Sequence, residues 1–390
     1  MSDVPERYVE LGLRLGRHLD GLVDAFFGPP KMAARVEQEQ LRQPADLARD
    51  ASELLESLDG LEEPRRRWLR DQLVGLETVA RKLEGEEIPY HEEVERCYGV
   101  RPERVPEDTL MEAHRKLDEV LPGSGTLSER YQAWREAGAV PADKLPVVIE
   151  SLLEEVRTRT GALLGLPDGE AVAVEYVTDE PWSAFNYYEG GLRSRVAVNT
   201  DVPITPAFVA HLISHETYPG HHTERAWKEA LLVRERDQVE ETILMIGAPQ
   251  SLVAEGIATL APEMVLGDEE HDVAAEHLVA AGVDYDPEVG RAVTEASQPL
   301  RHVRTNTALM LHADGGSEDD ALAYLMHWGL ISKQRAEQAL RFMTHPVWRS
   351  YGTTYTDGYR LSRAFVDGDP DRFKRLLTEQ LTPADLESGP

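Results

Sequence analysis

Apolar residues recur three and four positions apart along most of the chain, and this spacing constrains the fold more than any other feature of the sequence. The first stripe predicts one helix that runs from the start of the chain to a double proline at Pro29 and Pro30. Its members are Leu11, Leu15, Leu19, Leu22 and Phe26. The same spacing predicts helices around 46–58, 65–83, 106–120 and 127–137 and, most clearly, from Leu145 to Leu164. The sequence therefore predicts a mainly α-helical protein.

Between Gly165 and Thr205 the spacing changes to two, which is typical of strands. Residues 172–176 alternate, and residues 192–198 alternate again after a pair of glycines, so the pattern predicts a small antiparallel sheet beside the segment that follows. Residues 185–191 then form either an ordinary hairpin or an edge for an extended substrate. Helical spacing resumes at Thr205 and continues to about residue 380, with breaks expected near 262, 282–287, 315–316 and 345–346.

Charge and cysteine content exclude several classes of protein. The 390 residues include 71 acidic and 41 basic side chains, a net charge of −30, so nucleic acid and anionic membrane surfaces would repel the chain. The lone Cys97 cannot form a disulfide within the chain. No signal sequence or membrane span is apparent, and we expect a cytoplasmic protein that acts on a peptide or other small molecule. Oligomeric state is not indicated by the sequence.

Four of the 13 histidines lie within the twelve residues from His211 to His222, where an even distribution would place fewer than one. Neutral imidazole is a common ligand for zinc, and a glutamate beside a ligating histidine can take a proton from an activated water molecule. Glu216 follows His215 in this way. In the HExxH helix of metallopeptidases the second histidine comes four residues after the first, but here that position is Pro219.

A straight helix would place His211 and His215 on one face, and His215 and His221 about 9 Å apart along the axis. That separation is too large for two ligands of one zinc ion. Proline and glycine at positions 219 and 220 should widen, kink or end the helix, which could return His221 or His222 toward His215. Spacing alone leaves His211, His221 and His222 open as the second ligand.

The segment HETYPGHH, residues 215–222, resembles the HExxPGHH signature of a bacterial family described as domain of unknown function 885, which is related to zinc-dependent gluzincin peptidases. The resemblance covers most of the chain. It implies a helical zincin-like body with a cleft, in which residues 1–165 line the cleft and residues 166–390 carry the site within one compact body. It also implies that His215, Glu216 and His221 are metal or catalytic residues.

A second segment, EGIA at residues 255–258, resembles the EGWA segment of that family. The resemblance implies that Glu255 is the third metal ligand, and the apolar residues around it favour a buried position. The match is incomplete, because Ile257 replaces the tryptophan, and the second glutamate of the family falls on Pro262. Glu263 lies one position out of register, so its role is open.

Residues 351–359 resemble an SYxxG stretch of the family, which implies that Tyr355, or second Tyr359, donates a hydrogen bond to an oxyanion. Tyrosines four residues apart also occur in ordinary helical cores. An Asp-Thr-Gly-x-His pattern of the family is absent near Arg304 and His312, and we leave both outside the predicted site. An arginine facing the cleft would bind a substrate carboxylate and indicate carboxypeptidase action.

These residues predict a zinc-dependent hydrolase that cleaves the peptide bonds of short peptides. One Zn²⁺ ion held by His215, His221 and Glu255 would activate water, Glu216 would take its proton, and Tyr355 would stabilise the oxyanion. Two alternatives remain: a metal-dependent hydrolase of a non-peptide amide or ester, and a catalytically degenerate protein that binds peptides without turnover.

Overall fold

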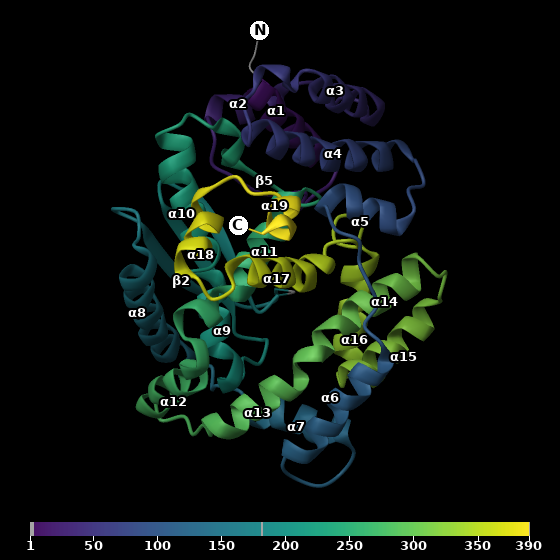
Figure 1. Ribbon diagram of the computed structural model, residues 1–390. Coiled ribbons are helices and arrows are strands. Elements are labelled where there is room, and N and C mark those ends of the chain that lie inside the picture. Colours follow the sequence, from purple (N-terminus) through teal and green to yellow (C-terminus); the bar gives the residue numbers. More distant parts are fainter. Residues whose placement is uncertain (1–3, 181, 390) are drawn as a thin grey trace.

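The computed structural model describes residues 4–180 and 182–389, which form a mainly helical body with small sheets (Figure 1). The helices before the main sheet are α1 (Val4–Gly16), α2 (Pro30–Gln38), α3 (Pro44–Glu56), α4 (Arg65–Glu84), α5 (Tyr90–Tyr98), α6 (Glu107–Val120), α7 (Leu127–Ala137) and α8 (Leu145–Leu164). Those after it are α9 (Pro206–Glu216), α10 (His221–Lys228), α11 (Pro249–Val265), α12 (Glu270–Ala280), α13 (Pro287–Ser297), α14 (Val303–His312), α15 (Glu318–Gly329), α16 (Lys333–Thr344), α17 (Thr353–Val366), α18 (Pro370–Thr378) and α19 (Pro383–Ser388). The predicted mainly α-helical fold class is confirmed.

The main sheet has three strands in the order β2–β4–β3: β2 (Ala171–Val177), β4 (Arg193–Asn199) and β3 (Ala184–Gly190). Strands β3 and β4 form an antiparallel hairpin whose turn contains Gly190 and Gly191, with φ of +75° and +67°. Strand β2 pairs with β4 in parallel. The predicted antiparallel pairing of 172–176 with 192–198 is therefore wrong. The intervening segment, whose aromatic and polar residues do not alternate cleanly, supplies the antiparallel partner instead.

The predicted first helix is too long. It ends at Gly16, and residues Val23–Phe26 form a strand, β1, which pairs antiparallel with β5 (Ile243–Met245). Gly21 lies between them with φ +79°, a conformation that ends regular helix. Leu22, just before the strand, and Phe26, at its end, are apolar. Their positions happen to continue the helical spacing of Leu11, Leu15 and Leu19. Strand β1 carries Asp24, which lies near the candidate site.

The predicted break near Pro262 is also wrong, because α11 continues through it to Val265. A proline has no N–H, so Pro262 cannot donate to the carbonyl of Ala258 one turn earlier. Pro262 lies within the last turn of the helix, where few further backbone bonds depend on it. The carbonyl of Ala258 is thereby left free of its usual helical partner.

Two hydrophobic cores meet at the helices that carry the candidate site. Helices α11 and α17 belong to a core shared with α1, α3–α5 and β5, whereas α9 packs in a second core with α8, β4 and α12. Helices α11 and α17 lie side by side (Figure 1). They approach each other closely at Gly256 and Gly358. A Cβ atom on Gly256 would lie 2.4 Å from the carbonyl oxygen of Gly358. Only glycine permits this approach, which brings the start of α17 beside Glu255.

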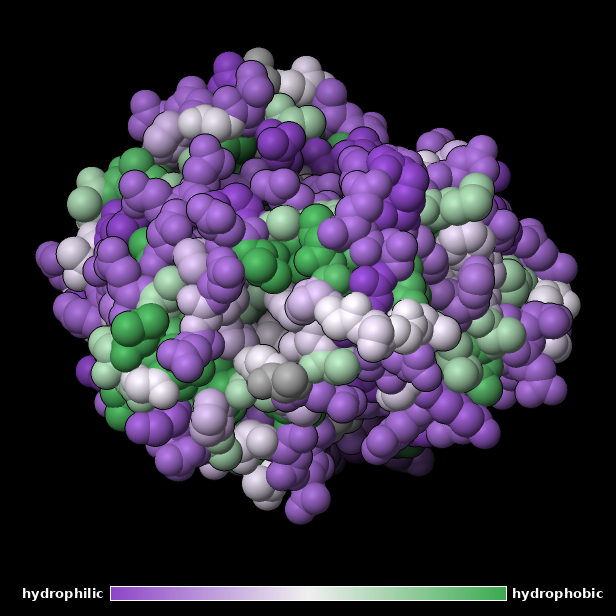
Figure 2. Space-filling model, turned by 90° about the horizontal axis from the view of Figure 1, so that it is seen from below, coloured by the Kyte–Doolittle hydropathy of each residue, from purple (hydrophilic) through white to green (hydrophobic). Residues whose placement is uncertain are grey.

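The surface agrees with the strong net charge. Hydrophilic residues cover most of the face shown in Figure 2, and hydrophobic residues form separate patches between them. Within residues 4–180 and 182–389, the helices are all too short or too polar to cross a lipid bilayer.

Candidate metal centre

A tight turn between α9 and α10 brings two histidines together. Helix α9 starts after the N-cap Thr205 and ends at Glu216, and α10 starts at His221. Between them, the N–H of Gly220 donates to the carbonyl of Ser214 over 3.1 Å. The chain passes so close to α9 that a Cβ atom on Gly220 would lie 1.9 Å from the carbonyl oxygen of His215. Glycine is required there, and the ring centroids of His215 and His221 end 4.8 Å apart.

The structure brings together the three residues predicted as metal ligands. Nε2 of His215 lies 3.5 Å from Oε2 of Glu255, and Nε2 of His221 lies 3.7 Å from its Oε1. One ligand atom from each of the three residues lies within 4.8 Å of the others. Ligands of tetrahedral zinc, at bond lengths near 2.1 Å, are about 3.4 Å apart. The spacing of the three side chains therefore suits a single divalent ion.

The electrostatics of the cluster also suit a cation. Burial lowers the pKa of His221 to about 3 and that of His215 well below its ordinary value, so both imidazoles are neutral and keep a lone pair. Burial, with smaller contributions from Asp24 and Glu224, raises the pKa of Glu255 to about 8. Oε2 of Glu255 is buried without a hydrogen-bond partner. A buried acceptor in that state is costly, and a bound cation would satisfy it.

The carbonyl freed by Pro262 orients His215. The imidazole of His215 hydrogen-bonds the backbone of Ala258, while its Nε2 faces Glu255. Ligating histidines commonly donate their other ring N–H to a carbonyl, which fixes the ring and the tautomer. The proline that departs from the family pattern thus leaves an acceptor in place for His215.

Glu216 is 7% exposed and lies at the end of α9, next to the edge strand β3. The side-chain amide of Asn186 on β3 donates to the carbonyl of Glu216 over 2.6 Å and holds this end of the helix. Burial raises the pKa of the Glu216 carboxyl to about 8; the charges of Glu255 and Asp24 add to the effect, and a hydrogen bond with the Asn186 backbone opposes it. Glu216 is therefore a carboxyl group that holds its proton to a much higher pH than an ordinary glutamate does.

The tyrosines of the C-terminal segment divide between two places. The phenol of Tyr351 donates to Oε1 of Glu255 over 2.6 Å. The ring of Tyr355 lies 5.6 Å from that of Tyr351, and its side chain is 37% exposed. Tyr359 instead donates to Glu263, outside the ligand cluster. Tyr351 was not predicted as a site residue; it lies in the turn just before α17, four residues ahead of Tyr355.

The remaining histidines of the motif are placed elsewhere. His211 lies one turn before His215, with ring centroids 6.1 Å apart, and its Nδ1 is 3.9 Å from Glu270. His222 is fully buried and bonded through both ring nitrogens, to Ser194 and Glu170. His312, outside the motif, contacts the carbonyl of Met343 at 2.8 Å.

Two charged residues near the cluster gave no signal in the sequence. Asp24 on β1 has its pKa raised to about 6 by burial, with Arg225 opposing the shift. Arg225 on α10 is 4% exposed, and its Nη2 has no hydrogen-bond partner. Both influence the pKa of Glu255, Asp24 by raising it and Arg225 by lowering it. The two come from segments far apart in sequence, so no local pattern could join them.

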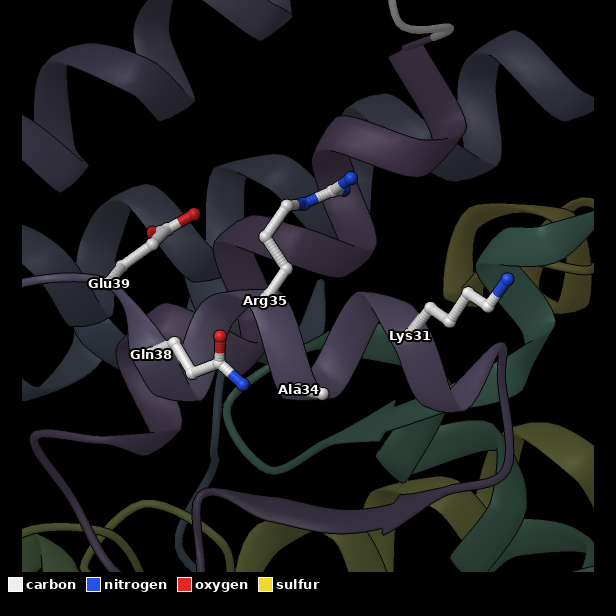
Figure 3. Close-up of a pocket in the computed structure, with 5 residues that line it drawn as sticks. All are labelled: Lys31, Ala34, Arg35, Gln38 and Glu39. Carbon is white, nitrogen blue, oxygen red and sulfur yellow. The ribbon is translucent and has the colours of Figure 1, made fainter.

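A surface hollow of about 390 Å³ lies on α2 and is separate from this cluster. It is lined by Lys31, Ala34, Arg35 and Gln38 on one side of the helix and by Glu39 just after its end (Figure 3). Lys31, Arg35 and Gln38 are exposed to solvent; Arg35 is paired with Glu10, and Glu39 is paired with Arg14. None of them is a predicted site residue.

Comparisons with known proteins bear on the fold. No family model matches the chain, and no curated protein matches it. Its structure is similar to that of the putative lipoprotein from Colwellia psychrerythraea, with a TM-score of 0.52 and 15% identity over 88% of this chain. A putative lipoprotein of unknown function from Shewanella oneidensis gives a TM-score of 0.50 and 13% identity over 92% of this chain. The chain spans 65% and 75% of these two proteins, respectively.

Proposed function

We propose that the protein is a zinc-dependent hydrolase that cleaves peptide bonds of short peptides. The observation that carries the proposal is the orphaned Oε2 of Glu255, buried 3.5 Å from the neutral imidazole of His215 and close to His221. These three residues would hold the ion. A divalent ion there supplies Lewis acidity, which makes water a nucleophile near neutral pH and polarises an amide carbonyl.

Residues around the ligands support the proposal of hydrolysis. Glu216 follows a ligand in sequence and has no competing cation within ion-pair distance among the described residues. Its pKa is raised to about 8 in the absence of a metal, and a divalent ion beside it would lower that pKa and favour the ionised form that accepts a proton. It can take a proton from water and return it to the leaving amine. Burial raises the pKa of Tyr355, and the charges of Glu255 and Glu216 add to the effect. Its phenol therefore keeps its proton and can donate a hydrogen bond to an oxyanion. Strand β3 offers an edge beside Glu216 for an extended substrate.

The test is hydrolysis of short peptides by the zinc-loaded protein, followed by mass spectrometry. Glu216→Gln keeps the shape of the side chain but cannot accept a proton. We expect it to bind one zinc ion per chain and to reduce kcat by about 10²- to 10⁴-fold. Unchanged turnover in this variant would remove Glu216 from the mechanism. Failure of the zinc-loaded protein to cleave any peptide, while it cleaves other amides or esters, would overturn the peptidase proposal.

A further inference from the structure

Helix α9 meets solvent along one narrow row of side chains that leads to the metal cluster. Of its 11 residues, all of which the structure describes, only Ala207, Phe208, His211 and His215 are not buried. Phe208 is 42% exposed, and the side chains of His211 and His215 are 26% and 14% exposed. Exposure therefore falls stepwise from the start of α9 toward the cluster. Solvent reaches this helix along the row, which ends at a predicted metal ligand.

The three rings of this row are stacked. The ring centroids of Phe208 and His211 lie 5.3 Å apart, with their planes inclined by 23°. Those of His211 and His215 lie 6.1 Å apart, with their planes inclined by 27°. The spacing of three and then four residues places all three on one face of the helix. Such a row of flat rings offers a surface on which a flat group of a substrate can stack.

A carboxylate without a strong partner lies beside the row. Glu270 is the first residue of α12, which packs against α9. Its Oε1 lies 3.9 Å from Nδ1 of His211, which is too far for a hydrogen bond. No lysine or arginine lies within ion-pair distance of Glu270 in residues 4–180 and 182–389. Arg301 lies instead over the ring of Tyr359, 4.9 Å from its centroid.

Other partly buried carboxylates of the protein have an arginine partner. Glu77 is paired with Arg96 at 2.7 Å, and Glu39 with Arg14 at 2.8 Å. Glu270 is also partly buried, and burial raises its pKa to about 7, with the charge of Glu263 adding to the effect. A cation beside Glu270 would stabilise its ionised form. The place next to His211 therefore suits a group that is both flat and positively charged.

We propose that Phe208, His211 and Glu270 bind a basic side chain of the substrate, best that of arginine. This inference rests on the proposed function and adds a substrate class to it: short peptides with arginine or lysine near the cleaved bond. A guanidinium is planar, stacks on aromatic rings and forms charge-assisted hydrogen bonds with a carboxylate. The net charge of −30 also attracts cationic peptides over a distance.

The geometry of α9 limits where the basic residue lies in the substrate. An α-helix rises about 1.5 Å per residue, so His211 and Phe208 lie about 6 and 10 Å from His215 along the axis. An extended peptide advances about 3.4 Å per residue. The basic residue is therefore within about three positions of the bond cleaved at the metal cluster.

The experiment uses two sets of alanine hexapeptides with free termini and the zinc-loaded protein. One set carries a single arginine at each position in turn, and the other carries citrulline, which has nearly the same shape but no charge. Mass spectrometry locates the cleaved bond. We expect arginine to raise kcat/KM about 10- to 100-fold over citrulline at a position within three residues of that bond, the range for a hydrogen bond between charged groups.

Two variants separate the contributions to this preference. Glu270→Gln keeps the size of the side chain but removes its charge, and should reduce the ratio of arginine to citrulline to about two- to fivefold, the part that stacking supplies. Phe208→Leu should lower the wild-type ratio by about two- to fivefold. Glu269→Gln is the matched control, because it removes the adjacent carboxylate, which is paired with Arg159 at 3.0 Å, and it should keep the ratio.

Binding gives a readout without turnover. Calorimetry on the zinc-loaded Glu216→Gln variant should show that the preferred arginine peptide binds about 10- to 100-fold more tightly than its citrulline counterpart. The same measurement on the double variant Glu216→Gln, Glu270→Gln should show most of this difference lost.

Equal kcat/KM and equal Kd for the two sets at every position would overturn the basic site while leaving the peptidase proposal intact. A full preference for arginine that survives in Glu270→Gln would overturn it too. Tighter binding of arginine peptides without hydrolysis of either set would support the site and contradict the peptidase proposal, so the two failures are distinguishable.

Discussion

His221 and His222 are adjacent in sequence, yet they belong to two histidine–carboxylate clusters that differ in one respect. Both ring nitrogens of His222 are bonded, at 2.8 Å to Ser194 and 2.9 Å to Glu170. The nearest carboxylate oxygen to Nε2 of His221 is 3.7 Å away, on Glu255. The first cluster is completed by the protein itself, and the second leaves donor atoms open. Residue type alone does not distinguish a structural histidine from a ligand; the state of its hydrogen bonds does.

The two carboxylates differ in the same way. Burial raises the pKa of Glu170, but hydrogen bonds from His222, Tyr218 and Arg157 outweigh it and lower the pKa to about 2. Glu255 has one such donor, Tyr351, and its pKa is raised to about 8. Glu170 is thus a satisfied anion, whereas Glu255 becomes a stable anion only when a cation is supplied.

Separate substitutions of His221 and His222 should produce the largest difference between the two clusters. His221→Ala removes one of three ligands, and we expect its zinc content to fall from one ion per chain to nearly none, with loss of hydrolysis. His222→Ala should keep zinc but destabilise the fold by about 1–3 kcal/mol, because Glu170 and Ser194 lose a buried partner. Metal analysis and urea unfolding measure the two effects.

His211→Ala serves as the control for this pair, since His211 shares a helix face with His215 but lies outside the ligand cluster. It should keep zinc. Loss of zinc in His211→Ala together with retention in His221→Ala would show that the ligands are those of a straight helix.

Removal of the single hydrogen-bond donor to Glu255 should have a smaller effect, which is a reduced affinity for zinc. Tyr351→Phe deletes the phenol that bonds Oε1 of Glu255. Residues that orient a metal ligand typically contribute about 10- to 100-fold to metal affinity, and we expect a loss in that range. Competition with a zinc chelator measures it. Tyr359→Phe, which breaks a contact with Glu263 instead, should leave the zinc Kd unchanged.

The smallest predicted effect is on the pH dependence of stability in the metal-free protein. The raised pKa of Glu255 means that folding takes up a proton between about pH 4.5 and 8, so stability decreases as pH rises through that window. Glu255→Gln should therefore gain more stability over the wild type at pH 8 than at pH 5 in urea unfolding. The lowered pKa of Glu170 acts oppositely: its contribution is present above about pH 4.5 and is lost as pH falls toward 2. Identical pH slopes for wild type and Glu255→Gln would contradict this assignment.

Sequence patterns predicted correctly those elements whose structure depends mainly on their own residues. The interval predicted for α8 matches the structure, because a long amphipathic stripe ended by Gly165 leaves few alternatives. The strand β1 was missed, since its partner β5 lies more than 200 residues away and its apolar spacing continued that of α1. The parallel pairing of β2 was missed for the same reason, because register between strands is set by contacts that periodicity does not record.

The site was predicted in part. The histidine motif and the resemblance supplied His215, His221 and Glu255, which the structure brings together, and Glu216 beside them. Straight-helix geometry could not choose among the three candidate second histidines, since the choice depends on a turn closed by Gly220. Asp24 and Tyr351 were missed because they reach the cluster from other segments, and Arg225, one turn after His221 on α10, was missed because nothing in the motif marks it. The metal-binding and catalytic roles of His215, Glu216, His221 and Glu255 stay predictions.

X-ray anomalous scattering at the zinc edge, from crystals grown with zinc, tests the central claim most directly. We predict one strong peak about 2.1 Å from Nε2 of His215, Nε2 of His221 and a carboxylate oxygen of Glu255, and none beside His222. Two results would contradict the account. One is that no zinc peak lies among these three side chains, and the other is that the peak is bound by His211 or His222 in place of His221.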